Sequence, residues 1–276
     1  MIEFLLSTFY FLIFCLIISK SSFFQDKTIP RNWVIGAFGL KVIVGVILTL
    51  IYSKYYTDRS TSDIFKYFDD SKILFNTFES NPIDFCKMMI GLDSDIEYFT
   101  TNYYQKMKFW TRAYEDGLVS DTHIIIRFNA LVQFFSFGYF NVHNVFMNFI
   151  SFMGLTLLFK AFKPYLKEKE RILFIVILLA PSVLFWGSGL LKEGIILLGF
   201  GLFLYSFFNI TTKFKPIYIL FGLLGFTLII YTKLYLLVAV FIPILGYSIN
   251  SIFKLKYIFY GYIISTVVFL LSINLI

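Results

Sequence analysis

The sequence has 276 residues, of which 58% are hydrophobic, 21% are aromatic and only 15% are charged. Typical globular domains are about 45–50% apolar and about 25% charged, so the 37 Phe and 19 Tyr residues exceed what one water-surrounded core can hold. The same numbers exclude a disordered chain, the two cysteines exclude a disulfide scaffold, and the formal net charge of +7 does not indicate nucleic-acid binding, because the basic residues flank hydrophobic runs. The composition therefore predicts an all-α, polytopic transmembrane helical bundle.

Runs of about 20 mostly apolar residues are the signature of membrane-spanning helices. Eight such runs occur, at 4–19, 33–53, 142–159, 172–186, 194–209, 216–231, 234–252 and 257–273. A weaker ninth candidate, 123–140, carries Arg127, Asn129 and Gln133. The first run has Glu3 where a signal peptide would have basic residues, so we expect it to be a retained span. The prediction is eight to nine spans.

One long polar segment, 54–121, separates the second and third runs. It holds 12 of the 17 acidic residues but only 8 of the 24 basic ones, which gives it a net charge of −4. We expect three parts: 1–53 with two N-terminal spans, 54–121 as an external acidic loop, and 122–276 as the transmembrane helical core.

The basic residues predict the orientation, since Lys and Arg concentrate in short cytoplasmic loops. They cluster at 20–31, 160–171, 213–215 and 254–256. Placing these four clusters inside puts the acidic loop and the 187–194 turn outside, provided that 123–140 does not cross the membrane. If that segment crosses, every later loop changes side; we prefer the first arrangement. The composition, rich in Phe, Ile, Lys and Asn, is typical of a bacterial chain, so the predicted location is the cytoplasmic (inner) membrane.

The acidic loop carries its own helix signals, which predict juxtamembrane amphipathic helices. Ser62 is a cap for a helix that begins at Asp63. The pair Asn81–Pro82 starts a second helix, and Gly91 ends it. A third helix is expected from about 95 to 114, where aromatic residues typical of the membrane–water boundary are crowded.

The candidate site is built from charges near the outer ends of the predicted spans, because a charge within the bilayer costs about 2.5–3.5 kcal/mol and often marks function. Asp63, Tyr67 and Asp70 share one helix face. An aspartate at a helix N-terminus is a candidate general base for an acceptor hydroxyl. The simpler interpretation is that these acids solvate a surface helix. The residues considered are Asp63, Tyr67, Asp69, Asp70, Arg127, Lys192, Glu193 and Lys233.

The helix break at 180–194 exposes backbone amides beside Lys192, an arrangement that suits a phosphate group. Its alternative is a simple turn whose Lys192 and Glu193 extend to the lipid headgroups. Lys233 and Arg127 have the same two interpretations. Lys41, in the middle of a span, is expected to pack against a partner. The two histidines lack companions at metal-ligand spacing, so neither a metal nor a cofactor is predicted.

Three short motifs carry a resemblance. They are Asp63-Ile-Phe-Lys-Tyr67, the stretch Phe137-Gly-Tyr-Phe-Asn-Val-His-Asn-Val, and Ala180-Pro181 followed by Lys192-Glu193. Their order over about residues 50–205 resembles the GT-C superfamily of membrane glycosyltransferases, in its dolichyl-phosphate-mannose transferase-like branch. That branch often has a second acid directly after the first, where this chain has Ile64 and only Asp69 and Asp70 further on as substitutes.

The resemblance implies that Asp63 orients or deprotonates an acceptor hydroxyl, while Lys192, Lys233 and Arg127 bind the phosphate of a lipid-linked sugar donor. The expected partners are that donor, a glycan or lipid acceptor, membrane lipids and an unidentified partner subunit, and the expected process is assembly of envelope polysaccharide or glycoconjugate. Two other functions stay open: a polysaccharide polymerase or ligase, and a non-catalytic transporter or flippase subunit.

Overall fold

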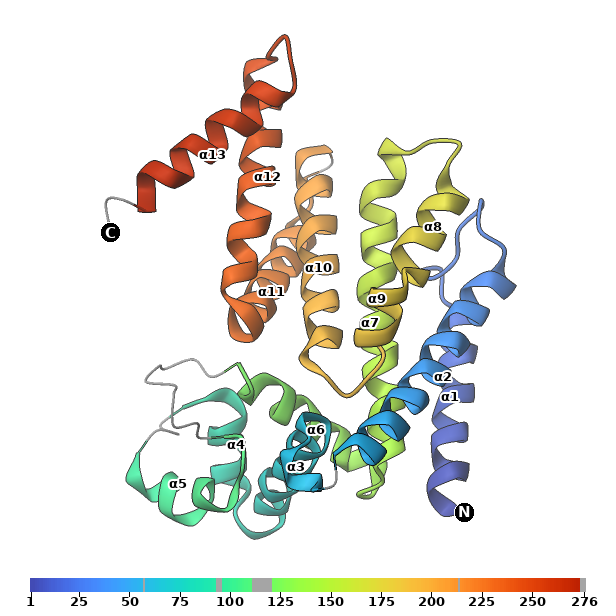
Figure 1. Cartoon of the computed structure of the whole chain (residues 1–276), viewed down its shortest axis with the longest axis vertical. Coiled ribbons are helices and arrows are strands. Elements are labelled where there is room, and N and C mark those ends of the chain that lie inside the picture. The colour runs from blue at the N-terminus through green and yellow to red at the C-terminus, as the bar shows by residue number, and fades with distance from the viewer. Residues whose placement is uncertain (57, 93–95, 111–120, 213, 274–276) are drawn as a thin grey trace. The chain divides into compact units, whose positions relative to one another are not determined.

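The computed structural model describes residues 1–56, 58–92, 96–110, 121–212 and 214–273, and all regular structure in these ranges is helical. The chain divides into two compact units, Met1–Thr232 and Lys233–Ile276. The helices of the first unit are α1 (Ile2–Lys20), α2 (Arg31–Tyr55), α3 (Asp63–Ser80), α4 (Pro82–Ile90), α5 (Glu97–Asn102), α6 (His123–Ser136), α7 (Phe140–Phe162), α8 (Glu170–Leu179), α9 (Pro181–Trp186), α10 (Lys192–Thr212) and α11 (Pro216–Lys233), whose last residue opens the second unit (Figure 1).

Six of the described helices are long and apolar enough to cross a membrane: α1, α2, α7, α10, α11 and α12 (Tyr235–Phe253). The chain is therefore a multi-pass helical membrane protein, but the predicted count of eight to nine spans is not confirmed. The run 172–186 is interrupted between α8 and α9, because Pro181 has no N–H with which to continue the preceding helix. Helix α6 has 14 residues and α13 (Phe259–Ile273) has 15, both short of the usual spanning length of about 20.

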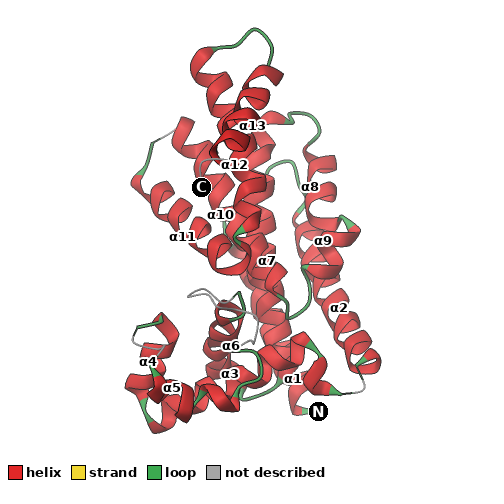
Figure 2. Ribbon diagram, turned by 60° about the vertical axis from the view of Figure 1, so that its left-hand side comes forward, coloured by secondary structure: helices red, strands yellow, loops and turns green. Residues whose placement is uncertain are grey.

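Helix α7 is the centre of the first unit. It packs against α10, α1, α2, α6 and α8, and Figures 1 and 2 show these helices arranged around it. The contact with α10 is closest at Gly154 and Gly201, where a Cβ on Gly201 would lie 2.2 Å from the carbonyl oxygen of Gly154. The absence of both side chains lets the two backbones touch, as small residues do at helix interfaces in membranes.

Helices α3 to α6 form a layer at the end of the bundle where α2 ends and α7 begins (Figure 1). The predicted start at Asp63 is confirmed, although Ser62 occupies the N-cap position without making a side-chain cap bond. The second predicted helix is also confirmed: Asn81 accepts the N–H of Asp84 at 3.2 Å, and Gly91 ends the helix at a φ of +78°.

The third predicted helix, 95–114, is wrong in extent. Helix α5 covers only Glu97–Asn102, and a 3₁₀ turn follows at Tyr104–Lys106; residues 95 and 111–114 lie outside the described residues. The aromatic side chains pack against one another instead of lining one helix face; Phe99, Tyr104 and Trp110 are buried, whereas Tyr98 stays exposed. The rings of Tyr104 and Trp110, for example, stack with their centroids 4.9 Å apart.

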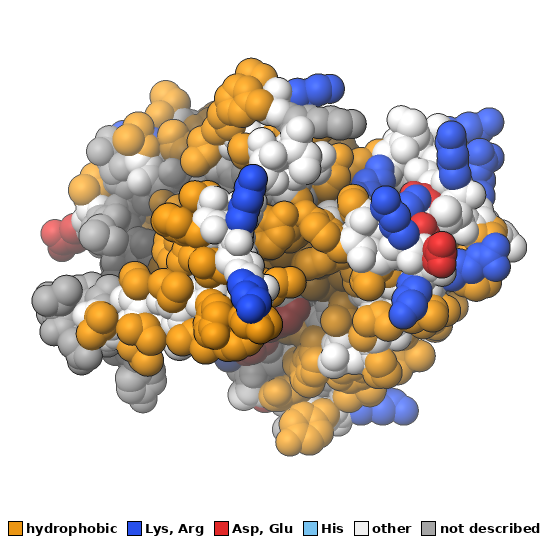
Figure 3. Space-filling view, turned by 90° about the horizontal axis from the view of Figure 1, so that it is seen from above, with side chains coloured by type: hydrophobic (Ala, Val, Ile, Leu, Met, Phe, Trp, Pro, Cys, Tyr) orange, Lys and Arg blue, Asp and Glu red, His pale blue; other side chains and the backbone are white. Residues whose placement is uncertain are grey.

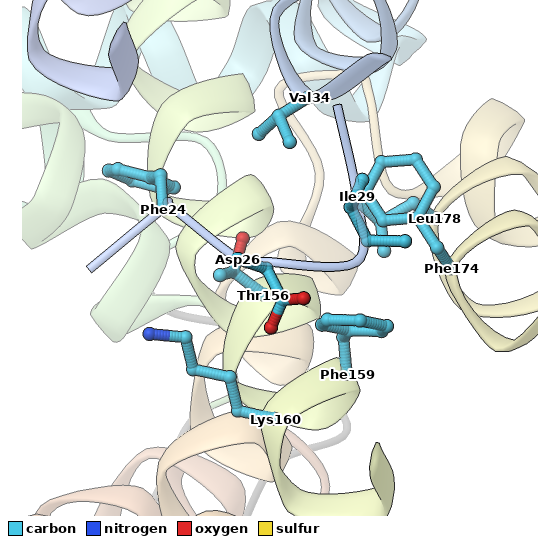
Figure 4. A pocket seen from close by; sticks show the side chains of 9 residues that line it. All are labelled: Phe24, Asp26, Ile29, Val34, Thr156, Phe159, Lys160, Phe174 and Leu178. Carbon is cyan, nitrogen blue, oxygen red and sulfur yellow. The ribbon is translucent and has the colours of Figure 1, made fainter. Parts of the chain in front are cut away.

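The opposite end of the first unit carries the loops at 21–30 and 163–169. Both carboxylate oxygens of Asp26 accept hydrogen bonds from Lys163 Nζ, at 2.7 and 2.6 Å, so these two loops lie together. Asp26 also borders a cavity of about 10 Å³, with Phe159 and Lys160 of α7 on its other side (Figure 4). Figure 3 is viewed from this side, and on its right it shows a group of blue side chains with few red ones among them.

The second unit contains α12 and α13, which pack against each other. Gly246 gives α13 a close approach, since a Cβ there would lie 2.3 Å from the ring of Tyr262.

Candidate functional site

The first turn of α3 carries the leading candidate, Asp63, which is half-buried. One face of the helix is buried, since Ile64, Tyr67 and Phe68 follow the apolar spacing of an amphipathic helix and are shielded from solvent. Tyr67, one turn after Asp63, is 1% exposed and meets the ring of Phe109 edge-on, with the centroids 5.4 Å apart.

The first turn of α10 reaches the same place from another part of the sequence. The Nζ atom of Lys192 lies 5.8 Å from the centroid of the Tyr67 ring and forms an ion pair with Asp121. The side chain of Lys192 is 10% exposed, which makes this a largely desolvated charge. The structure therefore brings Tyr67 and Lys192 together, as the sequence predicts.

Glu193 and Asp63 are linked through a third element, the C-terminal end of α2. The phenol of Tyr52 lies within electrostatic range of the carboxyl groups of both Asp63 and Glu193. One apolar cluster includes residues of α3 and of the start of α10, among them Ile64, Tyr67, Leu190, Leu191 and Ile195.

Asp70 has a different environment from Asp63. Its carboxylate is 1% exposed and accepts the backbone N–H groups of Lys108 at 2.8 Å and Phe109 at 2.7 Å. Burial raises the pKa of Asp70, and these two N–H groups only partly oppose that effect. Asp70 thus ties α3 to the segment that leads from α5 to Trp110, which is an anchoring role.

Asp69 pairs with Arg59 through two hydrogen bonds, of 2.9 and 3.1 Å. Both side chains are more than a third exposed, so this is a surface ion pair. The described contacts of Asp69 and Asp70 indicate structural roles, and their predicted catalytic role stays a prediction.

Arg127 lies within α6 and donates from Nε to the carbonyl oxygen of Met88 at 2.9 Å. Its guanidinium carbon is 5.4 Å from the centroid of the Trp110 ring. These contacts fasten the end of α4 to α6. Its predicted part in phosphate binding stays a prediction.

Lys233 is the first residue of the second unit, so its relation to Asp63 stays a prediction.

The two histidines have packing partners. His143 bonds to Asn129 at 2.8 Å and Ser136 at 2.7 Å, and His123 bonds to the carbonyl oxygen of Trp110 at 2.8 Å. Among the described residues there is no cluster of three or more His, Cys, Asp or Glu side chains arranged for a metal ion.

One contributor was not predicted as part of the site. Lys41, expected to pack against a partner in its span, is 1% exposed and binds the turn between α9 and α10 that immediately precedes Lys192. A single charge in an apolar run was the only sequence signal for it.

No family model, no curated protein and no solved structure matches this chain. The resemblance to membrane glycosyltransferases is therefore carried by the sequence motifs alone.

Proposed function

We propose that this chain is an integral membrane glycosyltransferase that moves a sugar from a polyprenyl-phosphate donor to an acceptor hydroxyl. The observation that supports this best is the approach of Lys192, at the start of α10, to the ring of Tyr67, which lies one turn after Asp63 on α3. Such a reaction needs a base for the acceptor and a cation for the leaving phosphate, and this junction offers one of each.

In the proposed reaction, Asp63 accepts the proton of the acceptor hydroxyl while the hydroxyl oxygen forms a bond to the anomeric carbon of the sugar. The bond between that carbon and the phosphate oxygen breaks, and its electron pair leaves with the polyprenyl phosphate. The ammonium of Lys192 stabilises the charge that develops on the phosphate. In this proposal Glu193 binds hydroxyl groups of the sugar, and the buried Tyr67, predicted to bind substrate, acts indirectly by holding its ring beside the Lys192 ammonium.

The side of the membrane is part of the proposal. Helices α3 to α5 lie in the acidic segment, whereas the other end of the first unit carries the basic loops joined by Asp26 and Lys163. The positive-inside rule then supports an extracytoplasmic site on the cytoplasmic membrane, in envelope polysaccharide or glycoconjugate assembly. Cys86, exposed on α4, is a native reporter: an impermeant thiol reagent added to intact cells should label it, and labelling only after lysis would reverse the orientation.

The test of the reaction is Asp63→Asn, with Asp69→Asn as a matched control on the same helix. Loss of a general base should slow sugar transfer by about 10²–10⁴-fold, while the control should keep parental activity because Asp69 pairs with Arg59 at the surface. The readout is transfer in isolated membranes, together with mass spectrometry of the lipid-linked sugars in cells.

Accumulation of one polyprenyl-phosphate sugar in Asp63→Asn cells is the expected result. Full transfer activity in that variant would remove Asp63 from the mechanism. An unaltered pool of lipid-linked sugars in cells that lack the gene would contradict the whole proposal.

One observation favours a second candidate, a non-catalytic transporter or flippase subunit. The turn between α9 and α10 is buried and bound by an ionisable side chain, Lys41, as at the broken helices of transporters. This function predicts that Asp63→Asn changes neither sugar transfer nor the pools of lipid-linked sugars. It also predicts that a lipid-linked sugar crosses the membrane of reconstituted vesicles only when the protein is present.

A further inference from the structure

The turn between α9 and α10, residues 187–191, lies inside the bundle. All five of its residues are buried, although they belong to no helix. Backbone groups that have left a helix need other partners when water is excluded, and at membrane depth such a break persists only where the protein supplies them.

Side chains from α2 and α7 supply these partners. The ammonium of Lys41 donates to the carbonyl oxygen of Gly187 and, at 3.2 Å, to the hydroxyl of Ser188. From α7, Ser151 Oγ donates to the same Gly187 oxygen at 2.9 Å, and Asn148 Nδ2 donates to the Ser188 oxygen at 2.8 Å. Both freed carbonyls are thus bonded from outside the turn.

The Lys41 nitrogen is surrounded by dipoles rather than by an opposite charge. Within the described residues no carboxylate pairs with its ammonium, and its oxygen partners are one carbonyl and one hydroxyl. Nearby, the Oδ1 atom of Asn148 is buried without a hydrogen-bond partner among the described residues. Oxygen atoms of this kind around a helix break are what a monovalent cation would bind, and here the chain's own ammonium takes that place.

The packing leaves the turn little freedom. A Cβ on Gly45, one turn after Lys41, would lie 2.3 Å from the Ser188 oxygen, and one on Gly189 would lie 2.3 Å from Leu48 Cδ2. Four residues after Ser188 the chain reaches Lys192, the first residue of α10. The position of the turn against α2 therefore decides where α10 begins and where Lys192 lies.

We propose that Lys41 is a positioning residue: its ammonium acts as a built-in cation that fixes the buried turn and so sets Lys192 and Glu193 against the first turn of α3. Its importance for sugar transfer rests on the proposed function, but its effect on the position of α10 does not. The proposal therefore has a structural readout of its own.

The experiment measures how fast a thiol reagent modifies Glu193→Cys in the full chain, with Cys15 and Cys86 changed to serine. Adding Lys41→Ala should change the labelling rate by about tenfold, the factor expected when one buried charged hydrogen-bond donor is lost. Lys54→Ala, which removes an exposed lysine of the same helix, should leave the rate unchanged.

Chemical rescue separates a positioning charge from simple packing. Lys41→Ala removes the atoms of one n-propylammonium ion, so added n-propylamine should return the labelling rate toward that of the parent, whereas n-propanol of the same size should not. Equal rescue by propanol would overturn the proposal, because volume rather than charge would then matter. An unchanged rate in Lys41→Ala would also overturn it.

If Lys41→Ala does not accumulate in membranes, Lys41→Met keeps the side-chain length without the charge. It should show the altered labelling rate and no response to n-propylamine; a parental rate in Lys41→Met would overturn the proposal. Because none of these measurements uses sugar transfer, failure of the proposed enzyme activity and failure of this inference are distinguishable.

Discussion

Asp70 offers a direct test of how the α3–α6 layer is held together. Its two carboxylate oxygens each accept one backbone N–H, from Lys108 and Phe109, and its side chain is almost fully buried. Asp70→Asn keeps the shape and one acceptor oxygen. It places an NH₂ group, which cannot accept, against the second backbone N–H.

The magnitude follows from these two bonds. Hydrogen bonds to a charged acceptor contribute about 1.5–3 kcal/mol each, and a neutral one about 0.5–1.5 kcal/mol. Asn keeps one neutral bond and relieves the burial of a charge, so the net loss should be about 1–3 kcal/mol. Asp69→Asn, which breaks an exposed ion pair with Arg59, should cost only about 0–1 kcal/mol.

Hydrogen exchange followed by mass spectrometry is the assay, on the full chain in lipid nanodiscs. The amides of Lys108 and Phe109 should exchange about 5- to 150-fold faster in Asp70→Asn, and at the parental rate in Asp69→Asn. Equal protection in both variants would refute the anchoring role. If Asp70→Asn then abolished sugar transfer without altering protection, Asp70 would return as a catalytic candidate.

Two further predictions concern packing and pH. Gly154→Ala should lower the melting temperature, at a cost of about 1–3 kcal/mol, because its Cβ would lie 2.3 Å from the carbonyl oxygen of Leu197; Gly36→Ala, with nothing within 4 Å, is the control that should not. Asp26 is partly buried, but its hydrogen bonds with Lys163 and Thr28 outweigh that burial and lower its pKa below the usual 3.8. Its stabilisation is therefore present above about pH 4 and is lost as the pH falls through the lowered pKa, so Asp26→Asn should be less stable at pH 7 and lose less of its stability on acidification. Equal acid sensitivity of parent and variant, measured by thermal unfolding, would contradict this.

Composition and the length of apolar runs suffice to predict a helical membrane protein, because a bilayer leaves the backbone no partners except those of a helix or a closed barrel. They do not predict where an apolar run breaks. The run 172–186 is apolar except for Ser182, yet α8 ends at Leu179 and α9 starts at Pro181, because proline has no N–H with which to continue the preceding helix.

The site could be predicted only in outline. Charge counts and helix spacing bring Asp63, Tyr67 and Lys192 to one end of the bundle. They cannot distinguish Asp63 from Asp70, because the partners of Asp70 are backbone N–H groups 38 and 39 residues further along the chain. Residue types do not reveal such partners, since nearly every residue has a backbone N–H. The same is true of Lys41, whose charge is visible but whose partner carbonyl is not.

The ion pair between Lys192 and Asp121 bears on how a phosphate would enter. Lys192 is 10% exposed and Asp121 is 35% exposed, so the carboxylate is the more hydrated of the two and is the easier one to return to water. Exchanging it for a phosphate oxygen leaves the buried ammonium paired throughout and avoids the large penalty of an unpaired buried charge. Donor affinity would then depend on the difference between two anions at one cation. In the proposed enzyme, the lipid phosphate therefore has to compete with the Asp121 carboxylate for Lys192.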